Sequence, residues 1–406
     1  MPELYSGKPV LGPGRACQSG LARRVRAVQQ GVKGFMRMLI VGPCIATVCV
    51  TAILFTADNP STVSTNSAAW SGKAAAAYLD GRLNWWIGWS VAARDHDTFC
   101  VSCHTVAPYG LARPVLRAAL GEQATSRPEQ KLLDNVTKRV RMWQQVAPFY
   151  PDESRGIPKT SESRGTESVL NALILAAHDA PAGRLSADSR LALDVMWGEQ
   201  LRAGEARGAW PWLQFHNAPW EGDSQYYGAT LAAVAVAVAP GGYRSDLAIQ
   251  DRLSLLRDYL VRERDSHILI DRVMLLWASA RLPGLVSPAE RQSIIEEAVG
   301  KQQADGGFSL SAFVGSWKRK DGTPLETRSD GYATGLVTLA LLEAGLPRTD
   351  SRLSRSLTWL SSNQQKTDGR WLAYSLNEQR DLTSYIGLFM SDAATAYAIL
   401  ALEHDK

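Results

Sequence analysis

The feature that most constrains the fold of this chain is a sequence motif that returns at a fixed interval. Residues 299–310 and 360–373 share two adjacent glutamines, a short gap, an Asp-Gly pair and an aromatic residue. Their Asp305 and Asp368 lie 63 positions apart, and each copy precedes a segment that opens with Ser-Asp and continues as an apolar run. Self-similarity of this kind indicates a fold built from one repeated supersecondary unit.

The repeated unit is predicted to be a hairpin of two helices. Its first helix mixes polar and apolar residues, whereas its second is apolar on all sides, as expected for a helix buried between an outer layer and a central cavity. Glycine and proline separate successive units. The six predicted pairs are 72–88 with 97–118, 129–145 with 163–179, 187–203 with 223–238, 248–262 with 266–281, 288–302 with 329–345, and 351–364 with 391–404. The predicted fold is all-α, an α/α6 toroid.

The segment Cys100-Val-Ser-Cys103-His104 has the spacing of covalent c-type haem attachment. Two thiols at i and i+3 can bond to both vinyl groups of one porphyrin, and the adjacent imidazole of His104 then ligates the iron. The hairpin register places the segment in the first inner helix, near its N-terminal end and one mouth of the toroid. The alternatives are a disulfide or dithiol, half of a zinc site, and two buried thiols beside an unrelated histidine.

A second axial ligand for the iron is not evident from the sequence. His267 and His216 are the better candidates, because their positions suit the same mouth of the toroid. An open site would suit ligand or oxygen chemistry, and a filled one electron transfer. His178, Met274 and Met390 are further candidates, whereas His96 lies too close in sequence to reach round easily.

Acidic residues recur where the inner helices begin. They are Glu167, Asp223, Asp271, Asp330 and Asp392. One interpretation is a ring of carboxylates at the cavity mouth, with Glu167, Asp223, Asp330 and Asp392 as candidate catalytic groups. The alternative is that they cap the helices and interact favourably with the positive end of the helix dipole.

The N-terminal region predicts a membrane anchor. Residues 1–37 hold seven Lys/Arg and one acidic residue, and residues 38–57 then run 20 positions without a charge. That length can span a hydrocarbon core, and the basic flank predicts that it stays in the cytoplasm. Residues 58–71 form a Ser/Thr/Asn/Ala tether to the toroid at 72–406. The predicted location is the bacterial inner membrane, single-pass, with the body in the periplasm. A cleaved signal peptide is the competing interpretation.

The charge of the body argues against nucleic acid as a partner. The basic segment takes seven of the 44 Lys/Arg and one of the 40 acidic residues, which leaves 37 and 39 and a net charge of −2. No basic stripe remains that would track a phosphate backbone. Export would deliver Cys100 to the compartment in which haem c is attached, although an oxidising compartment equally favours a disulfide.

The repeat resembles the QW motif of the terpenoid cyclase and protein prenyltransferase superfamily, which includes squalene-hopene cyclases. The match is strong at 302–308 and 364–371 and partial at 200–210. The resemblance implies alternating outer and inner helices around an apolar cavity, with each motif aromatic packed on the preceding helix. It does not extend to catalysis, because the DxDD acid of the cyclases and the zinc ligands of the prenyltransferases are absent. In particular, the chain is similar to exported members that carry CxSCHT near the start of the toroid.

Three hypotheses about function follow. The first is a membrane-anchored periplasmic toroid with covalent haem c, which binds an apolar molecule of the isoprenoid class and performs redox chemistry with a periplasmic electron-transfer partner. The second is a cyclase-like or isomerase-like enzyme that uses a cavity carboxylate without haem. The third is a non-catalytic binding toroid with a CxxC disulfide.

Overall fold

The computed structural model describes residues 70–220 and 225–404. The chain divides into two compact units, of which the second comprises Ser64–Lys406. The predicted basic segment 1–37, the anchor 38–57 and nearly all of the tether 58–71 lie outside the described residues. Among the helices of the described residues, none is both long enough and apolar enough to cross a membrane.

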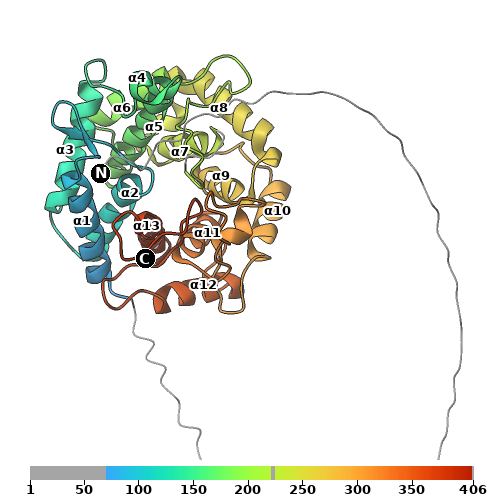
Figure 1. Cartoon of the computed structure of the whole chain (residues 1–406). Helices are drawn as coiled ribbons and strands as arrows, with labels where there is room; N and C mark the ends of the chain where they lie inside the picture. Colours follow the sequence, from blue (N-terminus) through green and yellow to red (C-terminus); the bar gives the residue numbers. More distant parts are fainter. Residues whose placement is uncertain (1–69, 221–224, 405–406) are drawn as a thin grey trace, which may run out of the picture. The chain divides into compact units, whose positions relative to one another are not determined.

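Within the described residues, six helices form a closed inner ring (Figure 1). Each packs against the next along the chain, and the last packs against the first. They are α2 (Val106–Ala119), α5 (Lys159–Asp179), α7 (Tyr226–Val238), α9 (Leu269–Arg281), α11 (Gly331–Glu343) and α13 (Phe389–Glu403). The prediction of an all-α toroid built from helical hairpins is confirmed for this part of the chain.

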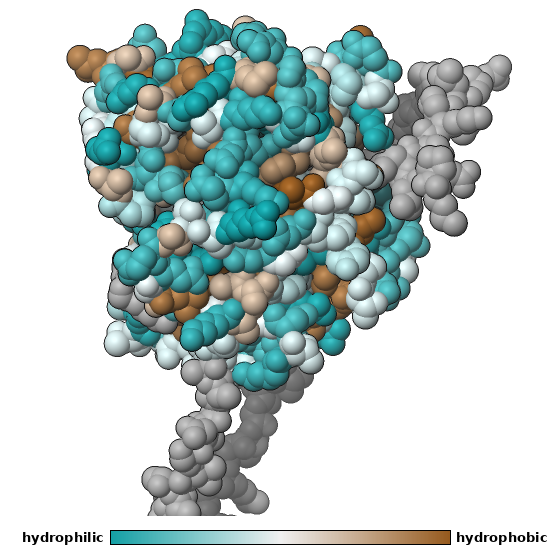
Figure 2. All heavy atoms as spheres, turned by 90° about the vertical axis from the view of Figure 1, so that its left-hand side faces the viewer, coloured by the Kyte–Doolittle hydropathy of each residue, from teal (hydrophilic) through white to brown (hydrophobic). Residues whose placement is uncertain are grey.

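The partner helix of each hairpin lies outside this ring (Figure 1). The outer helices are α1 (Gly72–Gly88), α3 (Arg127–Arg141), α6 (Ala187–Gly198), α8 (Gln250–Glu263), α10 (Pro288–Val299) and α12 (Ser351–Ser362). Their mixed composition lets one side pack on the inner ring while the other faces water. The face that carries α1 and α3 is accordingly mostly hydrophilic, with scattered apolar side chains (Figure 2).

The first inner helix begins later than the sequence predicts. Residues 97–105 are not helical, because the chain first forms a short antiparallel hairpin of β1 (Ala93–Arg94) and β2 (Thr98–Phe99). His96 and Asp97 turn this hairpin with positive φ angles of 52°. The Cys-x-x-Cys-His segment therefore lies in the connection ahead of α2, and not inside it. The remaining short elements are α4 (Asp152–Arg155), η1 (Ala180–Ala182), η2 (Tyr243–Ser245), η3 (Leu247–Ile249), η4 (Arg264–Ser266) and η5 (Leu310–Phe313).

In three of the hairpins, the repeated glutamine ties the end of one outer helix to the start of another. In each of three motif copies, its side-chain amide donates to the carbonyl of the turn glycine and to a carbonyl at the start of another outer helix. The sets are Gln200 with Gly208 and Arg252, Gln302 with Gly306 and Arg352, and Gln364 with Gly369 and Ser71. The bond from Gln364 to Ser71 joins α12 to α1, so it fastens the end of the ring to its beginning.

The motif aromatics are buried against the helix that precedes each turn. Trp210, Phe308 and Trp371 have no exposed surface. The indole of Trp371 donates to the Leu360 carbonyl in α12 at 2.8 Å. The predicted burial of Phe308 and Trp371 is confirmed, and for Trp371 so is the contact with the preceding helix.

Candidate functional site

The segment before α2 holds a histidine whose tautomer is fixed by its neighbour. Nδ1 of His104 lies 2.8 Å from the Thr105 hydroxyl, and that hydroxyl lies 2.6 Å from Oδ2 of Asp392 in the first turn of α13. A hydroxyl has one proton to donate, and a carboxylate can only accept it. Thr105 therefore donates to Asp392 and accepts from His104 Nδ1–H. This leaves the other ring nitrogen, Nε2, with a lone pair.

Asp392 is balanced by a buried cation. Arg82 of α1 donates to both carboxylate oxygens, at 2.7 and 2.9 Å, and the Tyr78 hydroxyl donates at 2.7 Å. Burial raises the pKa of Asp392, and the charge of Arg82 opposes that rise. With the pair ionised, the network has no net charge.

His104 is uncharged at neutral pH. Burial, followed by the positive charge of Arg82, lowers the pKa of its imidazole from 6.5 to about 3. The side chain is partly exposed, and no described residue forms a hydrogen bond with Nε2. His104 therefore offers one hydrogen-bond acceptor to a molecule in the mouth of the toroid.

Aromatic rings surround this imidazole. The ring centroid of Phe389 lies 3.9 Å from that of His104, with 23° between the planes. Trp86 presents an edge at 5.2 Å, and Trp220 lies at 5.5 Å. The Trp86 indole also donates to the Cys100 carbonyl at 2.7 Å, which holds the Cys-x-x-Cys-His segment against α1.

Three tyrosines continue the cluster into the ring of inner helices. Tyr332 and Tyr397 meet edge to face at 5.4 Å, and Trp220 lies 6.0 Å from Tyr332. Burial raises the pKa of Tyr227 and Tyr332, and it raises that of Tyr397 to about 12, so all three keep their hydroxyl proton at neutral pH. The Trp220 indole and the Tyr227 hydroxyl interact with the Tyr332 hydroxyl and partly oppose the rise in its pKa.

The two thiols of the predicted haem site lie in the connection ahead of α2. Cys100 and Cys103 are each 5% exposed and are not joined in a disulfide. Phe389 stacks on the face of the His104 imidazole and leaves its Nε2 lone pair, which lies in the ring plane, without a partner among the described residues. The described residues also contain no group of three or more His, Cys, Asp or Glu placed to hold a metal. Neither observation tests covalent attachment of haem c at Cys100 and Cys103 with His104 as iron ligand, which stays a prediction.

Two predicted acidic residues have structural partners away from His104. Glu167 of α5 forms a fully buried ion pair with Arg139 of α3. Burial raises the pKa of Glu167, and Arg139 opposes the rise. Asp330 caps the N-terminus of α11 and also accepts from the Leu310 amide at 2.6 Å. Burial raises the pKa of Asp330 to about 7.

The two predicted axial histidines have partners of their own. His267 lies 3.4 Å from the carboxylate of Asp271 and stacks on Tyr226 at 4.1 Å. His216 stacks on Trp317 at 4.6 Å. Asp223 lies outside the described residues.

The site thus combines the predicted His104 and Asp392 with residues that the sequence did not single out. Thr105, Arg82 and Phe389 come from three segments, and no shared motif links them. Arg82 in α1 is buried because closing the ring brings α13 and its Asp392 against it. The available sequence signal was the Thr that follows His104.

Comparisons with known proteins bear on the fold. No family model and no curated protein matches the chain. Solved structures with a similar fold include an unsaturated glucuronyl hydrolase with the oligosaccharide dGlcA-Glc-Rha-Glc, at 10% identity and a TM-score of 0.49, over 82% of this chain and 96% of that one. Another is the GH76A alpha-1,6-mannanase from Salegentibacter sp. HEL1_6, at 12% identity and a TM-score of 0.47, over 81% and 98%.

These findings correct the resemblance drawn from the repeat. The similar structures are glycosidases, from a different family of helical toroids than the squalene cyclases, and no cyclase family matches. The assignment to the terpenoid cyclase superfamily is wrong. The function inferred with it, haem-dependent redox chemistry on an isoprenoid, is wrong as well. At these identities and TM-scores the likeness concerns helical architecture and identifies no substrate.

Proposed function

We propose that this protein binds a small, neutral, hydroxyl-bearing molecule at the mouth of the toroid, with His104 Nε2 as the acceptor for one of its hydroxyl groups. One observation carries the proposal: the hydrogen-bond chain from His104 through Thr105 to Asp392. A histidine whose other nitrogen is fixed by a hydrogen bond presents a defined acceptor.

The charges of the site favour a neutral molecule. Asp392 and Arg82 balance each other, His104 is uncharged at neutral pH, and the nearby tyrosines stay protonated. A charged ligand would lose its hydration here without gaining an opposite charge, which is costly in a buried site.

The polar and apolar groups together favour a polyol or sugar. Such molecules carry hydroxyl groups beside apolar C–H faces. Their hydroxyls match the acceptor of His104. Their C–H faces match the aromatic rings around the imidazole. Sites of this kind are mostly apolar, and a few well-placed polar groups give them specificity.

The geometry supports binding more strongly than proton transfer. A general base works best when its pKa lies near the working pH. The imidazole of His104, with a pKa of about 3, is too weakly basic to hold a proton at neutral pH. It can still accept a hydrogen bond from a ligand hydroxyl.

The test compares two threonine variants in binding assays. The panel consists of neutral monosaccharides and oligosaccharides, each with a matching uronic acid or amino sugar, and the readout is the fluorescence of the tryptophans near His104. Thr105→Val keeps the side-chain shape and removes the hydroxyl, so the affinity for the bound sugar should fall about tenfold or more. Thr358→Val is the control, because that exposed hydroxyl bonds only within its own helix.

Unchanged affinity in Thr105→Val would refute the role of His104. Binding of charged sugars alone would refute the neutral class.

The N-terminal segment supports a separate proposal. From its charge distribution, we propose that residues 38–57 anchor the protein in the inner membrane with the toroid in the periplasm. A periplasmic reporter fused at about residue 65 should be active, and a cytoplasmic reporter there should be inactive. The reverse pattern would refute this topology.

A further inference from the structure

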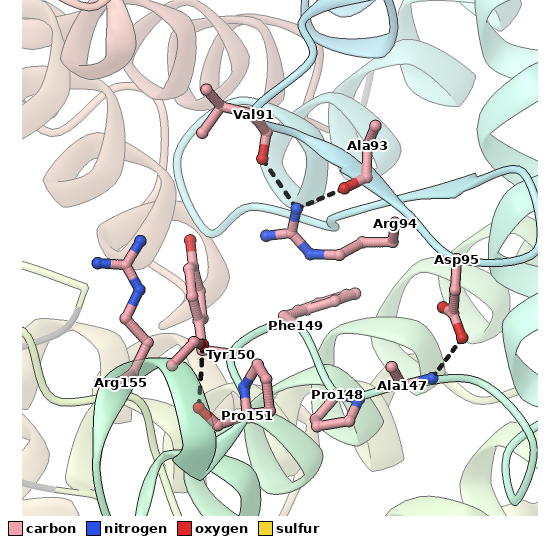
Figure 3. A pocket seen from close by; sticks show the side chains of 11 residues that line it. Val91, Ala93, Arg94, Asp95, Ala147, Pro148, Phe149, Tyr150, Pro151 and Arg155 are labelled. Carbon is pink, nitrogen blue, oxygen red and sulfur yellow. Dashed lines mark hydrogen bonds between the residues drawn. The ribbon is translucent and has the colours of Figure 1, made fainter. Parts of the chain in front are cut away.

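A pocket lies where two connections lead into inner helices, and His104 is not among its lining residues. It has a volume of about 460 Å³ and is formed by the residues around β1 and by the segment that leads into α5 (Figure 3). Both segments precede the N-termini of inner helices. Its lining includes Val91, Arg94, Phe149, Tyr150, Pro151 and Arg155.

Backbone carbonyls hold the guanidinium of Arg94 at this pocket through one of its nitrogens. Its Nη1 donates to the carbonyls of Val91 and Ala93 at 2.8 and 2.7 Å. Its guanidinium carbon lies 5.9 Å from the ring centroid of Phe149 and 5.4 Å from that of Tyr150. Nε is buried and has no acceptor among the described residues. Nη2 of Arg94 forms no hydrogen bond with a described residue, so it can donate to an oxygen of a ligand in the pocket.

Two arginines and one carboxylate line the pocket. Arg155 supplies a second cation, 5.7 Å from the Tyr150 ring (Figure 3). The only acidic side chain in its lining, among the described residues, is Asp95. That carboxylate already accepts from the Ala147 amide at 2.7 Å and lies 3.7 Å from Arg139. Arg139 is already paired with Glu167, so Asp95 keeps part of its negative charge at the pocket.

We propose that this pocket binds a small organic anion, namely a carboxylate attached to a ring. The two arginines match the carboxylate, and the side chains of Val91, Pro148, Phe149 and Pro151 form apolar walls for the ring. The volume lies within the range of small-molecule sites in proteins. This site is independent of the proposed sugar site, because the two share no residue.

Isothermal titration calorimetry with three matched probes tests the proposal. Benzoate has both the ring and the charge, acetate has the charge alone, and benzyl alcohol has the ring alone. The purified full-length protein should bind benzoate about tenfold or more tightly than either of the others, because only benzoate engages the arginines and the walls together. Equal binding of benzoate and acetate, or no saturable binding of benzoate, would overturn the proposal.

Two arginine variants locate the binding. Arg155→Gln should weaken benzoate binding about tenfold. Arg190→Gln should not, because that side chain is 55% exposed and lies outside the pocket. Equal losses in the two variants would show non-specific attraction to a basic surface and would overturn the proposal. Thr105→Val should bind benzoate like the wild type, which separates this site from the proposed sugar site.

Discussion

The hydroxyl of Thr105 donates to the carboxylate of Asp392 at 2.6 Å across 287 positions of sequence. Thr105 precedes the first inner helix, and Asp392 lies in the first turn of the last one. The bond therefore exists only when the ring is closed. Closing the ring also brings Phe389 onto the His104 imidazole. The candidate site is a product of ring closure, and its integrity should follow that of the fold.

The depressed pKa of His104 predicts a loss of stability in mild acid. The unfolded histidine takes up a proton below about pH 6.5, whereas the folded one stays neutral until about pH 3. Lowering the pH through this window therefore favours the unfolded state, by about 1.4 kcal/mol per pH unit. Relative to His104→Gln, the wild-type free energy of unfolding should fall by about 2 kcal/mol between pH 6.5 and pH 5. Denaturant unfolding measures both proteins, and parallel pH profiles would contradict the assigned pKa shift.

Two glycine substitutions should have opposite effects on stability. A Cβ added to Gly81 in α1 meets nothing within 4 Å, so Gly81→Ala should stabilise the protein by up to about 1 kcal/mol. A Cβ on Gly228 in α7 would lie 2.1 Å from the buried Trp212 ring. Gly228→Ala should destabilise by about 1–3 kcal/mol, as overpacking does. Chemical denaturation measures both, and a stabilising Gly228→Ala would show that Trp212 can move freely.

The closure bond at Gln364 should contribute measurably to stability. Gln364→Ala removes hydrogen bonds to Ser71 and Gly369, so the free energy of unfolding should fall by about 1–3 kcal/mol. Gln292→Ala is the matched control on an outer helix, because its amide bonds only to exposed Glu296. The control should change stability by no more than about 0.5 kcal/mol. Equal effects in the two variants would mean that ring closure does not depend on this motif.

The Arg82–Asp392 pair should show strong coupling. Arg82→Met leaves a buried carboxylate without its cation and should cost about 3–5 kcal/mol. In the double variant with Asp392→Asn, part of that loss should be recovered, because no unpaired charge remains buried. A double-mutant cycle of unfolding free energies gives the coupling. Additive losses would contradict a direct ionised pair.

The repeat made the fold predictable, because helix periodicity and the Gln-aromatic motif are local signals. Five of the six inner helices begin within about four residues of the predicted position. The exception is the segment before α2, which tertiary contacts hold in a hairpin and a turn. Cys100 donates its backbone amide to the Ala92 carbonyl at 2.8 Å, and its own carbonyl accepts from Trp86. No local pattern in the sequence encodes those contacts.

The site was predictable only in part, because spacing alone does not reveal packing. The Cys-x-x-Cys-His pattern located His104 but suggested an iron ligand. The structure instead pairs this imidazole with Thr105 and packs it on Phe389, which is 285 positions away in the sequence. Acidic residues at helix starts were equally ambiguous: Asp392 joins the site, while Asp330 caps its helix. Which acidic residue joins the site and which caps its helix becomes apparent only in the closed ring.

Nitrogen NMR of the protein labelled with ¹⁵N-histidine tests the central claim most directly. The His104 signal is identified by its absence in His104→Gln. The account predicts a protonated Nδ1 and a bare Nε2 at pH 7, with no protonation of the ring between pH 8 and pH 5. A protonated Nε2, or titration of His104 near pH 6.5, would contradict the hydrogen-bond chain through Thr105 to Asp392.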